Sequence, residues 1–302
     1  MTDAQRIKNL ASPQGKIDAV LDTDAYNEID DQFAISYMLK NPERINVKAL
    51  FAAPFHNSRS DGPKDGMEKS YHEIGRLLSL IGLDVPTYRG SESYLPSEKT
   101  PIDSPAAREL VRLAKEYSPE KPLYVVAIGA ITNVASALLL SPEIAENIVV
   151  VWLGGHAYHY HDTKEFNLRQ DIAAARVVFS SGAPVVLLPC FGVVSAFTVS
   201  KPELEYWLVG KTPLSDYLAK NSIEEADAYA FGKPWTRVIW DVTAVAWLLN
   251  DGGRFMEERF EDTRLPSYDA LYEEPSGLPK LKYVYHINRD ALMSDLFKKI
   301  LS

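Results

Sequence analysis

Four aspartates are crowded into the stretch VLDTDAYNEIDD, which runs from Val20 to Asp31. Asp22 and Asp24 stand two residues apart at the end of an apolar run, so we expect both side chains to leave the same face of a strand. Asp30 and Asp31 open the next segment of helical period. The N-terminus of a helix stabilises a carboxylate by about 0.3–1 kcal/mol, which is too little to hold four converging charges. A raised pKa, solvation of the side chains or a bound cation would relieve the repulsion.

A bound cation is the interpretation that explains the acids as a group. Any one of them alone is most simply a helix cap or a solvated side chain, but four at a strand end directly before a helix indicate a functional site. Carboxylates without clustered cysteines favour a hard cation, and the residue types leave Ca²⁺ and Mg²⁺ both open. Asp241, in the segment RVIWDVTAVAWLLN, opens an apolar helix and is a further candidate, although an ordinary N-cap would explain it by itself.

The elements that must position these acids alternate between short apolar runs and longer segments of helical period. Buried strands are expected at Ile17–Asp22, Val47–Ala53, Leu123–Ile128, Ile148–Leu153 and Val185–Pro189. Helices are expected at Asp30–Leu39, Glu68–Ile81, Ser104–Tyr117 and Asp171–Ser181. The alternation predicts an α/β fold, an open and mainly parallel sheet flanked by helices, in which ligands bind beyond the carboxyl ends of the strands.

The rest of the chain is less regular in pattern. From about Thr198 the pattern is mostly helical, with one late strand expected at Lys282–Ile287. Two long polar segments, Pro54–Asp65 and Gly154–Gln170, are expected to be loops that carry function. Because no repeat, low-complexity tract or linker interrupts the sequence, we expect a single domain over residues 1–302.

The composition limits the classes of partner and the compartment. A formal net charge of −9 argues against a nucleic-acid or anionic-membrane surface. The only cysteine, Cys190, excludes an internal disulfide and lies in an apolar run, so we expect a buried, unreactive thiol. No apolar run approaches the roughly 20 residues that span a bilayer, and the polar N-terminal stretch lacks the apolar core of a signal peptide. We therefore expect a cytoplasmic protein.

Several stretches, in order along the chain, carry a resemblance to a known family. After the D-x-D and D-D of the opening motif they are ALFAAPFHN, VVAIGAITNVASALLLSPEI, VVVWLGGHA, EFNLRQDIAAARVVFSSGAPV and IWDVTAVAW. Over roughly Lys16 to Leu249 the chain thereby resembles the inosine–uridine-preferring nucleoside hydrolases. The resemblance implies an enzyme of nucleoside salvage that cleaves the N-glycosidic bond of a purine or pyrimidine ribonucleoside, depends on Ca²⁺ and assembles as a homodimer or homotetramer.

The resemblance also assigns roles to particular residues. The implied calcium ligands are Asp24, Asp31, the backbone carbonyl of Ile128, and Asp241. Asp24 is also the implied general base, which accepts a proton from the attacking water. The implied ribose-binding residues are Asp30, Asn57, Glu165 and Asn167. Without the resemblance, a turn would explain Asn57 and a solvated loop would explain Glu165 and Asn167. For Thr132 and Asn133 we expect only a capping role at the start of a helix.

The chain departs from the family pattern at two places that bear on the substrate. Many members place a histidine, as general acid, directly before the late aspartate, where this chain has Trp240. An indole can stack on a base but is no practical proton donor. The remaining candidates for the acid are His56, His156, His159, His161, Tyr158 and Tyr229, each more simply a surface or packing residue. The turn between D-x-D and D-D is AYNEI, two residues longer than usual, which brings Asn27 and Glu28 to the mouth of the site. His56, directly before Asn57, is expected to crowd the same pocket.

Two other functions are weighed against this one. The motif DTD also suits a haloacid-dehalogenase-like phosphatase with Asp22 as nucleophile and Asp24 as acid, but the later acidic pair that this chemistry needs is missing from the sequence. Trp240 also suits a calcium-dependent nucleoside- or sugar-binding protein without catalysis, although such a protein has less need of the base Asp24.

Overall fold

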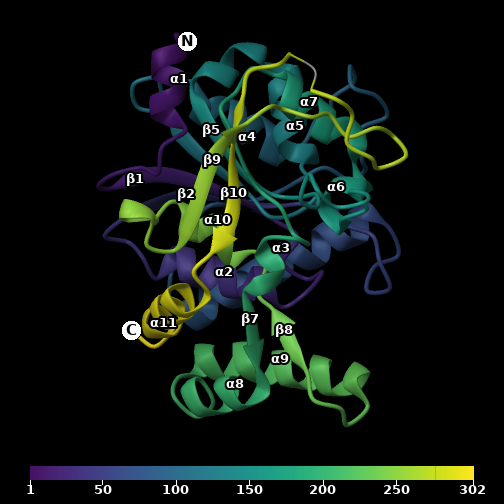
Figure 1. The fold of residues 1–302 in the computed structure, drawn as a ribbon. Helices are drawn as coiled ribbons and strands as arrows, with labels where there is room; N and C mark the ends of the chain where they lie inside the picture. The colour runs from purple at the N-terminus through teal and green to yellow at the C-terminus, as the bar shows by residue number, and fades with distance from the viewer. Residues whose placement is uncertain (276) are drawn as a thin grey trace.

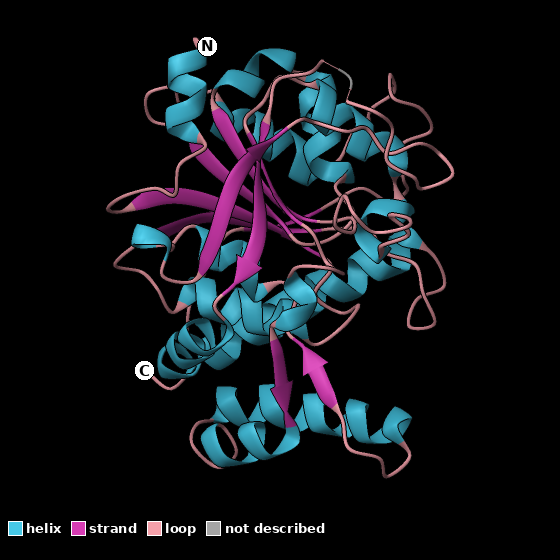
Figure 2. Ribbon diagram, in the orientation of Figure 1, coloured by secondary structure: helices cyan, strands magenta, loops and turns pink. Residues whose placement is uncertain are grey.

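A mostly parallel sheet of eight strands, in the order β3–β2–β1–β4–β5–β6–β10–β9, forms the centre of the molecule (Figure 2). The computed structural model describes residues 1–275 and 277–302. Within them the strands of this sheet are β1 (Ile17–Thr23), β2 (Ile45–Ala52), β3 (Thr87–Arg89), β4 (Leu123–Ala127), β5 (Ile148–Leu153), β6 (Val185–Leu188), β9 (Met256–Glu261) and β10 (Leu281–Ile287). Only β9 runs antiparallel to its neighbour. The predicted α/β fold with a mainly parallel sheet is confirmed.

Helices cover both faces of the sheet (Figure 1). The α-helices are α1 (Asp3–Asn9), α2 (Asp30–Leu39), α3 (Pro63–Ile81), α4 (Pro105–Ala114), α5 (Thr132–Leu140), α6 (Phe166–Gln170), α7 (Ile172–Ser180), α8 (Lys201–Trp207), α9 (Pro213–Ala230), α10 (Val242–Trp247) and α11 (Arg289–Ile300). Short 3₁₀ segments lie at Pro142–Glu146, Val194–Ala196 and Asp251–Gly253. Helices α2, α3, α10 and α11 pack on one face, and α4, α5 and α7 pack on the other. None of the described helices is long and apolar enough to cross a membrane.

The two-sided core explains why the inner strands read as continuous apolar runs. In β1, Ala19 and Leu21 belong to the core beneath α2 and α10, whereas Val20 belongs to the core beneath α4 and α5. All three side chains are fully buried. A strand covered by helices on both faces has no solvent-facing side, so its sequence does not alternate between apolar and polar residues.

The strand order places a crevice between β1 and β4. From β1 the chain proceeds through β2 and β3 toward one edge of the sheet, and β4, β5 and β6 continue toward the other. The crossover connections therefore diverge at the carboxyl ends of β1 and β4, which is where open α/β sheets bind their ligands. Asp24 follows β1 and Ile128 follows β4 directly.

Most predicted elements are confirmed. Helix α1 was not predicted, α3 begins at Pro63 within the predicted loop Pro54–Asp65, and α6 lies within the predicted loop Gly154–Gln170. The other differences lie at the edges of the sheet and in the C-terminal half. Helix α2 has the predicted bounds, and the five early strands and the late strand occupy the predicted segments. The short strand β3 and the edge strand β9 were not predicted, because β9 (MEERFE) keeps several polar side chains in solvent and has no core pattern. The antiparallel hairpin of β7 (Thr198–Ser200) and β8 (Thr236–Val238), which carries α8 and α9 away from the sheet, was also missed (Figure 1).

Candidate active site

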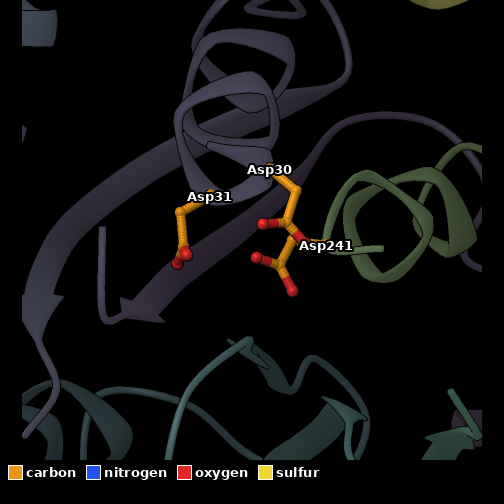
Figure 3. A group of neighbouring side chains, drawn as sticks. All are labelled: Asp30, Asp31 and Asp241. Carbon is orange, nitrogen blue, oxygen red and sulfur yellow. The ribbon is translucent and has the colours of Figure 1, made fainter. Parts of the chain in front are cut away.

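Three aspartates from two distant segments meet at the crevice (Figure 3). Asp30 and Asp31 are the first residues of α2, and Asp241 directly precedes α10. One carboxylate oxygen of each lies within 4.8 Å of those of the other two, and all three residues are buried. Although Asp241 occupies the N-cap position of α10, its side chain makes no capping hydrogen bond. An ordinary cap therefore does not account for Asp241.

Asp24 lies beside this trio and has no exposed surface. Its backbone carbonyl accepts a hydrogen bond from the N–H of Asn27 at 2.7 Å, which closes the turn after β1. Both carboxylate oxygens are buried and accept no hydrogen bond from any described residue. A buried carboxylate without a donor is costly unless a cation or a proton satisfies it.

Burial first, and repulsion from neighbouring carboxylates second, raise the pKa of every member of this group. Burial raises the pKa of Asp31 to about 7, against the stabilising hydrogen bond of 2.5 Å that the Thr23 hydroxyl donates to it. The pKa of Asp24 and that of Asp241 lie well above their usual range because of burial first and of the neighbouring aspartates second. Burial is also the largest cause of the raised pKa of Asp30. The repulsion expected from the sequence is therefore present, and an all-oxygen donor set with two unpartnered carboxylate oxygens fits a hard cation such as Ca²⁺.

A cleft of about 240 Å³ opens above the aspartates. Its walls contain nine residues that the sequence pointed to, namely Asn27, Glu28, Asp30, Ile128, His156, Glu165, Asn167, Trp240 and Asp241. The fully buried Asp24 and the 1% exposed Asp31 lie below the surface of the cleft. Asn57 and His56 are not part of its walls.

Glu165 and Asn167 are held rigidly in the wall of the cleft. Glu165 is the N-cap of α6, and its carboxylate accepts hydrogen bonds of 2.8–2.9 Å from the N–H groups of Gly155, Asn167 and Leu168. The side-chain amide of Asn167 donates to the carbonyls of Ile128 and Leu153 at 3.2 and 3.1 Å. The solvated-loop interpretation of both residues is therefore wrong. One lone pair of the Ile128 carbonyl is engaged by Asn167, which leaves the second for another ligand.

The AYNEI insert lies at the mouth of the cleft and is fixed from two sides. The side-chain carbonyl of Asn27 accepts a hydrogen bond of 2.6 Å from the side-chain amide of Asn57. Asn57 therefore contacts Asn27 of the insert, which in turn lines the cleft. Glu28 forms an ion pair of 3.0 Å with Arg237 from β8. His56 is exposed, and its backbone N–H donates to Gln170. The expectation that the His56 side chain crowds the cleft therefore has no support in the structure.

The structure corrects the interpretation of three polar residues near the site. Asp22 does not join the acidic trio, because its carboxylate accepts a hydrogen bond of 2.8 Å from Asn133 on the α5 side of the sheet. Asn133 and Thr132 are not caps, since α5 begins at Thr132 and its N-cap is Ile131. Instead, the Thr132 hydroxyl donates to Asp171 at 2.7 Å. Both side chains connect α5 to neighbouring segments.

The sequence indicated no role in the site for several residues of the cleft wall. These are Leu153, Lys164, Phe166, Cys190 and Phe191. Phe191 follows β6 at the same sheet edge as the aspartates, so the rule about carboxyl strand ends would have found it, but an apolar residue gave no chemical signal. The ring of Phe191 meets Trp240 edge to face, with centroids 5.4 Å apart. Cys190 is buried as predicted, and burial raises the pKa of its thiol.

Comparisons with known proteins bear on the family and the fold of this chain. The family model described as inosine-uridine preferring nucleoside hydrolase matches residues 19–274. The pyrimidine-specific ribonucleoside hydrolase RihA of Salmonella typhimurium is 27% identical over 249 residues, which cover 73% of this chain and 76% of that protein. RihA of Citrobacter koseri is 31% identical over 183 residues, 52% of this chain and about half, 55%, of that protein's length. Among solved structures, a plant nucleoside hydrolase is similar in fold, with a TM-score of 0.74 and 20% identity over 95% of this chain and 99% of the other.

Proposed function

This chain belongs to the inosine-uridine preferring nucleoside hydrolase family, and from that premise we propose that it is a calcium-dependent hydrolase of ribonucleosides. Membership makes it an N-glycosyl hydrolase with a small-molecule nucleoside as substrate. The observation that carries the proposal is the buried aspartate group at the β1–β4 crevice, which contains unpartnered carboxylate oxygens and opens into a cleft. Purine and pyrimidine ribonucleosides are both candidate substrates.

The residues proposed to hold the ion are Asp24, Asp31, the carbonyl of Ile128, and Asp241. They supply only oxygen donors, as calcium prefers. Asp30 also lies within 4.8 Å of Asp31 and Asp241, measured between carboxylate oxygens, and is proposed to bind a ribose hydroxyl instead. A bound Ca²⁺ would neutralise the acidic group, orient the attacking water and the ribose diol, and lower the pKa of that water.

The remaining chemistry belongs to the side chains of the chain itself. Asp24 is proposed to accept a proton from the water as the bond between ribose C1′ and the base nitrogen breaks. Positive charge develops on the ribose ring at that moment, and the surrounding carboxylates stabilise it electrostatically. Glu165 and Asn167 are held by backbone hydrogen bonds, so they can orient ribose hydroxyls with little loss of side-chain entropy. Trp240 is proposed to stack on the departing base.

The test is hydrolysis of a panel of ribonucleosides by the purified protein, with release of free base and ribose as the readout. Activity with calcium that disappears on chelation and returns when calcium is restored supports the proposal. Absence of cleavage of every N-riboside in the presence of calcium contradicts it. Tight nucleoside binding without turnover would instead support the alternative of a non-catalytic binding protein.

Three further expectations belong to this proposal. A homodimer or homotetramer is expected from the resemblance and is tested by light scattering of the purified protein. A cytoplasmic location is supported by the single, buried cysteine, which suits a reducing compartment. The acidic net charge of −9 supports a small-molecule partner rather than nucleic acid.

A further inference from the structure

Two loops at the carboxyl ends of β5 and β6 are joined by their backbones beside the cleft. The N–H of Cys190 donates to the carbonyl of Gly155 at 2.8 Å, and the N–H of Ala157 donates to the carbonyl of Phe191 at 2.9 Å. Gly155 has φ +71°, which a residue with a side chain rarely adopts, and this conformation turns the chain after β5. His156 is the residue that the turn places between the two loops.

The ring of His156 is held on several sides. Its centroid lies 5.2 Å from that of Tyr160 and 4.9 Å from that of Phe191. Its backbone N–H donates to the Thr163 hydroxyl at 3.0 Å, and only 6% of the residue is exposed. The residue nevertheless lines the cleft, together with Phe191 and Trp240. Such packing fixes an aromatic side chain in one orientation.

One hydrogen bond determines which nitrogen of this ring carries the proton. The backbone N–H of Phe191 donates to Nδ1 of His156 at 3.3 Å. A nitrogen that accepts a hydrogen bond is unprotonated, so the neutral ring has its proton on Nε2. Among the described residues no acceptor is found for Nε2–H. Burial lowers the pKa of His156, against the opposing effect of Asp162, so the ring is neutral near neutral pH.

We propose that His156 donates a hydrogen bond from Nε2–H to the departing nucleobase, and so takes over leaving-group stabilisation where Trp240 offers no proton. The inference rests on the proposed hydrolysis of nucleosides and adds a residue to it. The base would lie between the aromatic side chains of Trp240 and Phe191, with a ring nitrogen or carbonyl oxygen directed at His156. Tyr160 and the Thr163 hydroxyl are positioning residues for this ring.

The proton balance requires a hydrogen bond rather than a full transfer. As the bond from C1′ to the base breaks, its electron pair goes to the base, and Nε2–H stabilises the negative charge that develops there. The proton stays on His156, because a neutral imidazole is too weak an acid to give it up. Asp24 accepts one proton of the attacking water, whose oxygen bonds to C1′ as a hydroxyl. That proton passes from Asp24 to solvent and the base takes up a proton from solvent, so the products are ribose and neutral base. One well-placed donor to developing negative charge contributes about 10²–10³-fold to the rate.

The test compares two leaving groups in the wild type and in H156A, H156Q and H72A. The substrates are the best ribonucleoside of the panel and 4-nitrophenyl riboside, whose departing phenolate is stable without a hydrogen bond. We expect H156A to lower kcat on the nucleoside by about 10²–10³-fold and to leave cleavage of the nitrophenyl riboside within a few-fold of wild type. H156Q, which keeps an N–H donor, should recover part of the loss. H72A changes an exposed histidine of α3, outside the cleft, and should behave like the wild type.

If H156A loses activity equally on both substrates, His156 acts in folding or in ribose binding, and the inference is overturned. The inference is also overturned if H156A keeps wild-type activity on both substrates. If H156A does not fold, H156Q is compared with the wild type instead. The rate of nucleoside cleavage divided by the rate of nitrophenyl riboside cleavage then decides by the same criteria. A wild-type protein that cleaves neither substrate with calcium present refutes the proposed function, which is a separate outcome.

Discussion

Replacing Asp31 by asparagine is expected to change stability in opposite directions with and without calcium. Asp31 is 1% exposed, and its pKa rises from an ordinary 3.8 to about 7. At about 1.4 kcal/mol for each tenfold change in the acid constant, this rise costs the ionised carboxylate about 4 kcal/mol. Burial is the largest cause of this rise, and repulsion from the carboxylate of Glu28 adds to it. Without metal, D31N removes this cost and should stabilise the fold by about 2–4 kcal/mol.

The same linkage gives the direction of the pH dependence. Because the folded state raises the pKa of this acid, folding takes up a proton between the unfolded value of 3.8 and the folded value of about 7. The stability of the metal-free protein is therefore highest at low pH within this window and is lost as the pH rises through about 7. Above that pH the wild type carries the full cost, whereas D31N carries none.

Calcium should reverse the comparison. With the ion bound, the carboxylate has a positive partner. Removing the carboxylate should weaken calcium binding by about 1,000-fold, since an interaction of about 4 kcal/mol is lost. Urea unfolding at about pH 8, once in chelator and once in millimolar calcium, measures both effects. D84N changes an exposed aspartate and should alter neither. If D31N destabilises the protein equally in both conditions, the cation-site reasoning is refuted.

Three shorter predictions follow from the same geometry. D24N should lower kcat by about 10²–10⁴-fold in the base-release assay, with an unchanged circular dichroism spectrum, and activity within tenfold of wild type would exclude Asp24 as the base. G155A should lower the free energy of unfolding by about 2–4 kcal/mol, because Gly155 has φ +71° and the new Cβ would collide with the Tyr272 hydroxyl. An unchanged midpoint of urea unfolding would contradict this. W240A should raise KM for nucleosides about 5–150-fold, because stacking on the base is lost. The affinity for free ribose, measured by calorimetry, should change little. An unchanged KM would place the base away from Phe191 and Trp240.

The elements nearest in sequence were predictable because local patterns specify them. Helix α2 begins at the predicted Asp30, since the acidic pair and the apolar run after it are both local signals. The inner strands were predictable because burial on two faces leaves an unbroken apolar run. The pairing of β7 with β8 was not predictable from the sequence, because each strand has only three residues and the two strands are about 36 residues apart along the chain.

The sequence by itself determined the family, the sheet and the presence of a crowded acidic motif between Asp22 and Asp31. Only the tertiary structure decided which acids meet, because Asp241 reaches Asp30 and Asp31 through the packing of α10 against α2, while Asp22 is directed to Asn133 on the other face. It also decided that a histidine of the β5 loop faces the cleft. Residue types and spacing define the chemistry that is possible, but the side-chain directions come from long-range packing that no local pattern encodes.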